Sequence, residues 1–168
     1  MSRNEDRIVR FSGIKPGIYD YRIVLGDDFF GEFENEEIEG GNVEFDVRME
    51  RTERVTMLTF TFHGHVATRC DRCLGPMQVE VAGEEHLNVR FSDTEQSDDE
   101  SIVVLPEDAF ELDLGPWLYE YVAVRLPMQH VHPDGECDPD TVKYIADEAN
   151  SKDDDYVDPR WEALKKLK

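Results

Sequence analysis

Apolar and polar residues alternate along three stretches of the chain, and this period of two predicts half-buried β-strands. The clearest stretch places Val43, Phe45 and Val47 on one face, with charged residues between them on the other. Residues 55–70 and 77–91 show the same alternation over longer runs. Successive strand residues point to opposite faces of a sheet, so each of these segments has one face for the core and one for solvent. The three stretches predict the centre of an antiparallel sheet.

Shorter segments of similar character flank this central part. Residues 8–11 and 18–25 predict two short strands, and residues 27–34, with phenylalanines among acidic residues, predict a short helical turn. Residues 102–105 and 110–112 predict short edge strands.

The apolar period changes to that of a helix after residue 113. Leu114 and Leu118 belong to a series of apolar residues spaced three and four apart, which is the pattern of one helix face. Asp113 is a suitable N-cap residue, and Pro127 is expected to end this helix. Residues 140–150 predict a second, short helix.

The end of the chain carries an acidic linker at residues 151–158 and then a candidate docking helix. Asp158 and Pro159 suit the start of a helix, and an apolar stripe on a charged segment suits binding to a partner. Packing of this stripe on the chain's own domain is the alternative. The candidate partner-binding residues are Arg160, Trp161, Leu164 and Leu167.

Together these elements predict an α+β fold dominated by an antiparallel sheet, either open or barrel-like. The sheet contains a hairpin with a Cys-x-x-Cys tip, and one helix packs on it. Residues 1–150 are expected to form a single domain, with a mobile acidic loop at about 92–101. Residues 151–168 are expected to form the linker and the short C-terminal helix.

The charge of the chain limits the kinds of molecule that it is expected to bind. Aspartate and glutamate number 39 against 18 lysines and arginines, which gives a formal net charge of −21. Phosphate binding depends on Lys and Arg, so extensive contact with bare DNA or RNA is disfavoured, and a basic protein is the favoured partner. The alternative is that the charge serves solubility alone. No apolar run approaches the ~18 residues that span a membrane, and the start shows no secretory signal. A cytoplasmic location is expected.

Cys70 and Cys73 are the residues with the most informative spacing. They lie at the predicted hairpin tip, where two thiols separated by two residues can bind one metal ion, and Gly75 is expected to let the turn close. His132 and Cys137 lie far downstream and would complete a Cys3His set suited to structural zinc. His130 competes with His132 for the fourth position.

Other interpretations of the cysteines remain. A thioredoxin-like redox motif begins a helix, whereas Cys70 and Cys73 lie between predicted antiparallel strands, so redox catalysis is disfavoured. His63 and His65 share one strand face and could also bind metal, although exposed strand surface is the commoner role of such a pair. The sequence contains no glycine-rich phosphate loop, serine-hydrolase pattern or His-Glu-x-x-His element.

The chain resembles the YceD family of large ribosomal RNA subunit accumulation proteins. The shared elements, in family order, are Cys70-Asp71-Arg72-Cys73-Leu74, the stretch from Asp113 through Tyr121 to Leu126-Pro127, His132 followed by Cys137, and the ending from Asp158 to Leu167.

This resemblance implies a cytoplasmic, non-enzymatic protein that is needed for normal synthesis, processing or accumulation of large-subunit ribosomal RNA. It also implies that Cys70, Cys73, His132 and Cys137 are the family's motif positions. Because the chain is so acidic, the expected route to the RNA is contact with a basic ribosomal protein or an assembly factor. Two other functions stay open: a thiol oxidoreductase using Cys70 and Cys73, and a general acidic chaperone for basic proteins.

Overall fold

The computed structural model describes residues 7–11, 13–33, 37–53, 55–94, 97–99 and 101–150, with the backbone alone for 147–150. The chain divides into two compact units. The first comprises Met1–Arg69 and Pro76–His130, and the second comprises Cys70–Gly75 and Val131–Lys168.

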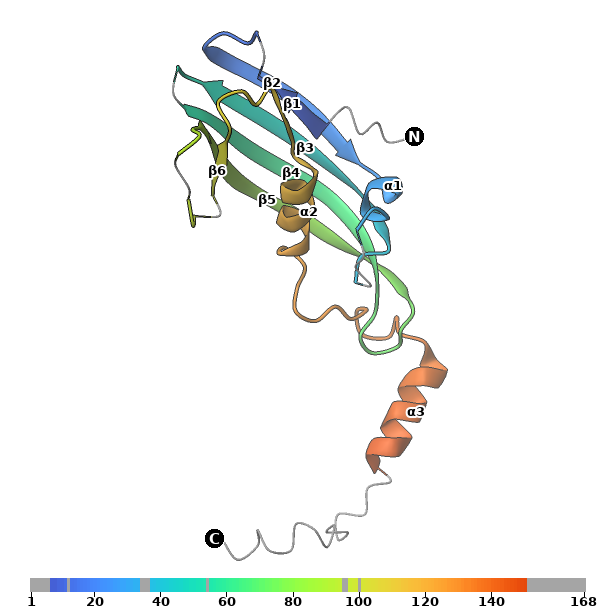
Figure 1. Cartoon of the computed structure of the whole chain (residues 1–168). Coiled ribbons are helices and arrows are strands. Elements are labelled where there is room, and N and C mark those ends of the chain that lie inside the picture. Colours follow the sequence, from blue (N-terminus) through green and yellow to red (C-terminus); the bar gives the residue numbers. More distant parts are fainter. Residues whose placement is uncertain are drawn as a thin grey trace, which may run out of the picture. The chain divides into compact units, whose positions relative to one another are not determined.

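The first unit is built on a five-stranded sheet of order β2-β3-β4-β5-β6 (Figure 1). Its strands are β2 (Gly17–Leu25), β3 (Gly40–Arg51), β4 (Val55–Arg69), β5 (Pro76–Phe91) and β6 (Ile102–Leu105). A separate antiparallel pair joins β1 (Ile8–Arg10) to β7 (Glu111–Asp113). The helices of this unit are α1 (Asp27–Phe30) and α2 (Gly115–Ala123). The α+β class and the strands predicted from alternation are confirmed.

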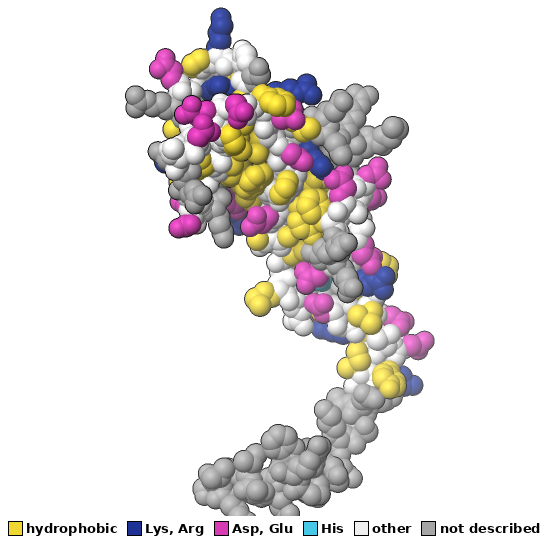
Figure 2. Space-filling model, in the orientation of Figure 1, with side chains coloured by type: hydrophobic (Ala, Val, Ile, Leu, Met, Phe, Trp, Pro, Cys, Tyr) yellow, Lys and Arg dark blue, Asp and Glu magenta, His cyan; other side chains and the backbone are white. Residues whose placement is uncertain are grey.

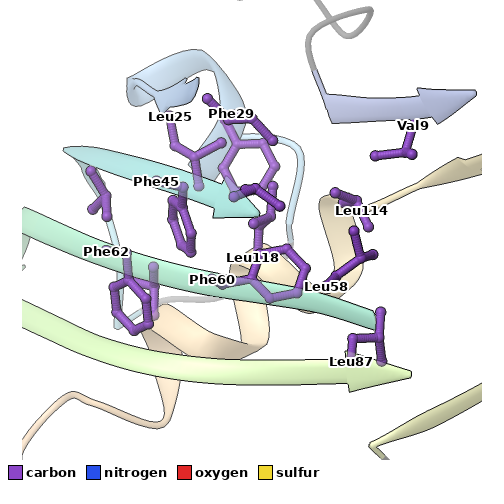
Figure 3. Close-up of a cluster of buried hydrophobic side chains, with 14 of the residues drawn as sticks. Val9, Leu25, Phe29, Phe45, Leu58, Phe60, Phe62, Leu87, Leu114 and Leu118 are labelled. Carbon is purple, nitrogen blue, oxygen red and sulfur yellow. The ribbon is translucent and has the colours of Figure 1, made fainter. Parts of the chain in front are cut away.

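The sheet is open, so the barrel-like alternative is wrong. β2 and β6 form its two edges, and β6 runs parallel to β5 while all the other neighbours are antiparallel. Closure is unnecessary because other elements cover the apolar face. Side chains of α1, α2 and the β1–β7 pair join the strands in one buried hydrophobic cluster (Figure 3). The opposite face of the sheet remains polar, as the alternation predicts.

Large side chains on facing strands fill the core. Phe45 of β3 and Phe62 of β4 are register partners, and their rings stack with centroids 4.8 Å apart. Phe60 is also fully buried, and its ring lies 5.3 Å from that of Tyr121 on α2. Such aromatic pairs add directional packing to the burial of apolar area, which fixes how the helix lies on the sheet.

The boundaries of α2 differ from the prediction at both ends. Its N-cap residue is Leu114, one residue later than expected, although the Asp113 carboxylate still accepts a hydrogen bond of 2.8 Å from the Gly115 N–H. The helix ends at Ala123, well before Pro127. Tighter bonds follow there, with Arg125 N–H donating to Val122 and Leu126 N–H to Ala123. These i→i+3 bonds satisfy carbonyl groups of the last turn and end the helix.

The second unit contains α3 (Pro139–Asn150), which confirms the predicted helix over residues 140–150. Its remaining described parts are the hairpin tip Cys70–Gly75 and the segment 131–138. Every described residue of the buried hydrophobic cluster lies in the first unit. Among the described residues, no helix combines the length and apolar character that crossing a membrane requires.

Candidate metal centre

The tip of the β4–β5 hairpin is a short loop closed by backbone hydrogen bonds. The Cys70 N–H donates to the Gly75 carbonyl at 2.9 Å, and the Leu74 N–H donates to the Cys70 carbonyl at 2.8 Å. The turn closes through a left-handed residue, which is Leu74 with φ 57°. Gly75 is not in the left-handed region, but a Cβ atom at this position would lie 3.4 Å from Cys73 Sγ. The loop turns Cys70 and Cys73 toward one centre, as the hairpin prediction requires.

The segment that follows residue 130 brings His132 and Cys137 to the same place. Cys70 Sγ lies 3.8 Å from Cys137 Sγ, and Cys73 Sγ lies 3.3 Å from His132 Nδ1. His132 Nδ1 and Cys137 Sγ are 3.9 Å apart. The four ligand atoms all lie within 4.8 Å of one another. The predicted Cys3His set is therefore one spatial cluster, assembled entirely within the second unit.

The three individual separations of 3.3, 3.8 and 3.9 Å are close to the edges of a zinc tetrahedron. Two thiolates bound to zinc at about 2.3 Å with a tetrahedral angle lie about 3.8 Å apart, and a thiolate–imidazole edge is slightly shorter. The observed sulfur–sulfur distance of 3.8 Å agrees with that edge. Three thiols and one imidazole also form a donor set that zinc favours in structural sites. The residues present are thus close enough, and of the right kind, to hold a metal ion.

His132, rather than His130, lies in the cluster. The Nδ1 atom of His130 is 3.2 Å from the Pro127 carbonyl oxygen instead. His63 and His65 belong to β4 in the first unit and are not part of the cluster. Across the described part of the chain, no other set of three or more such side chains brings its ligand atoms this close together.

Backbone N–H groups surround the thiols and favour their charged forms. Burial opposes ionisation of Cys70, but N–H groups of Cys73, His132 and Arg72 outweigh it and lower its pKa to about 6. The Arg72 and His132 N–H groups each lie 3.4 Å from Cys70 Sγ. The N–H groups of Asp138 and Gly75 lower the pKa of Cys73. Metal-bound cysteine thiolates commonly accept hydrogen bonds from backbone amides in this way.

Cys137 behaves in the opposite way. Burial and the neighbouring thiols of Cys70 and Cys73 raise its pKa. Three thiolates at this spacing repel one another, so they need a cation among them to ionise together. A divalent metal ion would supply that charge, and its binding would displace the protons that the thiols still carry.

The same geometry bears on the redox alternative. A depressed thiol pKa, which that function requires, is present at both Cys70 and Cys73. Cys70 is fully buried, whereas Cys73 is partly exposed, as catalytic thiols are. The loop, however, lies between antiparallel strands and does not begin a helix. The position in a β-hairpin, rather than the exposure or the pKa of the thiols, is what distinguishes this centre from a thioredoxin-like motif.

Asp138 is a residue of this centre that the sequence prediction missed. Its carboxylate accepts hydrogen bonds from the Thr141 N–H at 3.1 Å and the Thr141 hydroxyl at 2.6 Å, so it caps α3. Its own N–H faces Cys73. The pattern Asp-Pro-Asp-Thr immediately after Cys137 is the signal that could have revealed a helix start tied to the centre.

The candidate docking helix cannot be placed in the same way. Arg160, Trp161, Leu164 and Leu167 lie outside the described residues, as does the linker 151–158.

Comparison with known proteins gives one match. Residues 58–168 match the model of a protein family described as "Large ribosomal RNA subunit accumulation protein YceD". The matched region begins in β4 and includes all four residues of the Cys3His cluster. No curated protein and no solved structure matches the chain.

Proposed function

Because the chain belongs to the YceD family of large ribosomal RNA subunit accumulation proteins, we propose that it is a non-enzymatic factor in ribosome assembly. It would support the synthesis, processing or accumulation of large-subunit ribosomal RNA in the cytoplasm. The family match over residues 58–168 is the observation that carries this proposal.

In this proposal the Cys3His cluster holds structural zinc. Cys70, Cys73, His132 and Cys137 would supply all four ligands, and a site closed by four protein ligands leaves no position for a substrate or an activated water. Bound zinc would tie the hairpin tip to the segment before α3. The centre then shapes a surface and carries out no reaction.

The charge of the chain supports contact with the ribosome through a basic protein. A net charge of −21 repels phosphate but speeds association with a positively charged ribosomal protein or assembly factor. The residues proposed for docking are Arg160, Trp161, Leu164 and Leu167, since an apolar stripe in a charged helix suits a protein groove.

An affinity purification of the tagged chain from its own cell extract at moderate salt tests this function. We expect enrichment of one large-subunit protein or of precursor large-subunit RNA, and migration with pre-ribosomal particles on a density gradient. A Trp161→Ala variant should lose most of this enrichment, because truncating a buried aromatic anchor commonly lowers affinity tenfold or more.

The general acidic chaperone provides the contrasting outcome. Such a protein would retain unrelated basic proteins such as lysozyme equally well, and retention would fall steeply with salt. Recovery of the chain in light fractions only, without large-subunit RNA or protein, would contradict the assembly role.

A further inference from the structure

Leu74 combines two features that its residue type does not favour. Its φ of 57° lies in the left-handed region, where a Cβ atom approaches the following carbonyl oxygen and where glycine or asparagine is preferred. Its side chain is also 69% exposed, so burial in this chain does not offset the strain. A strained apolar residue in solvent at the tip of a loop suggests that its side chain contacts something outside the chain.

The helix of the same unit also exposes apolar side chains. Val142 is 37% exposed and Ile145 is 45% exposed. They are three residues apart, a spacing that puts both on one side of α3. Figure 2 shows hydrophobic side chains at the surface of this helix next to acidic ones. No described residue of this unit belongs to the buried hydrophobic cluster, so among the described residues Val142 and Ile145 do not border a core.

The charge around these residues selects the kind of partner. Over the loop Cys70–Gly75 and residues 131–150, the basic residues are Arg72 and Lys143. Acidic residues outnumber them there, and these are Asp71, Asp134, Glu136, Asp138, Asp140, Asp147 and Glu148. A partner surface with an apolar pocket bordered by lysines and arginines would complement both the exposed apolar side chains and the negative charge.

We propose that Leu74, Val142 and Ile145 form a docking surface, the loop-and-helix surface, for a basic protein of the large ribosomal subunit. This inference rests on the proposed function, which supplies the class of the partner. The cluster formed by Cys70, Cys73, His132 and Cys137 holds the loop that carries Leu74, and α3 begins directly after that cluster. The centre thereby positions both parts of the surface.

Binding of the full chain to proteins extracted from purified large ribosomal subunits tests this surface, with lysozyme as the unrelated basic protein. We expect the wild-type chain to retain one or a few large-subunit proteins, and Leu74→Asn and Ile145→Ser each to weaken that binding about tenfold. Asn adopts the left-handed conformation more readily than Leu, so Leu74→Asn should melt at the same temperature or higher and keep its metal content. Leu74→Met, which keeps an apolar side chain, is the matched control and should bind nearly as the wild type does.

Two results would overturn the proposal in distinguishable ways. If Leu74→Asn and Ile145→Ser bind the same large-subunit proteins with wild-type affinity, the loop-and-helix surface is wrong while the proposed function stands. If the wild-type chain retains no large-subunit protein, or retains lysozyme equally well, the loop-and-helix surface is wrong. The proposal that the chain reaches the ribosome through a basic protein is then wrong as well.

Discussion

Replacing Cys73 by serine is expected to abolish stoichiometric zinc binding and to unfold the second unit while the sheet stays folded. The reason lies in how the two units are stabilised. All described residues of the buried hydrophobic cluster belong to the first unit, whereas the buried side chains described in the second are those of Cys70 and Cys137. The described part of the second unit would therefore depend on the proposed zinc, and structural zinc contributes on the order of 10 kcal/mol in small zinc domains.

Metal analysis and hydrogen exchange on the same preparations would measure this effect. We expect Cys73→Ser to lose most of its zinc and to lose exchange protection over residues 131–150, with protection in β3, β4 and β5 unchanged. Treating the wild-type protein with a zinc chelator should give the same pattern. His132→Ala, which removes the proposed histidine ligand, should also lose zinc. His130→Ala is its matched control and should keep zinc, because His130 faces the Pro127 carbonyl rather than the cluster.

If Cys73→Ser showed an unchanged melting profile and unchanged hydrogen exchange over residues 131–150, a structural zinc ion that stabilises this segment would be excluded. Zinc content that stays equimolar in that variant would also contradict the proposed ligand set. Loss of zinc in His130→Ala but not in His132→Ala would show that His130, and not His132, is the histidine ligand.

Replacing Phe60 by alanine is expected to lower the free energy of unfolding of the first unit by about 3–5 kcal/mol. Phe60 lies on the central strand β4 with no exposed surface, and its ring contacts that of Tyr121 on α2. Truncation would remove apolar contact and leave a cavity between sheet and helix, which a close-packed interior fills only in part. Urea denaturation monitored by circular dichroism would measure the change.

Thr61→Ala is the matched control for this prediction. Thr61 is the next residue of the same strand, and its side chain lies on the exposed face of the sheet. Its substitution should change the free energy of unfolding by less than about 1 kcal/mol. If Phe60→Ala proved no more destabilising than Thr61→Ala, the packing of α2 on the sheet would be wrong.

The local pattern of the sequence determined most of the secondary structure and the composition of the centre. Alternation identified β3, β4 and β5 because a strand with one buried face must place apolar residues at every second position. The same reasoning placed Cys70 and Cys73 at a hairpin tip, and residue chemistry nominated Cys137 and a nearby histidine, His132 or its competitor His130, as their partners. These features depend on neighbours along the chain, which a sequence displays directly.

The tertiary structure decided what depends on residues distant in sequence. His130 and His132 differ by two positions in one loop, and only the fold places His132 beside Cys73. The sheet is open because helices and the β1–β7 pair cover its apolar face. The alternation of apolar and polar residues does not distinguish an open sheet from a barrel. The left-handed conformation of Leu74 follows from closing the loop between two fixed strands. In each case long-range packing, and not local preference, selects the state of lowest free energy.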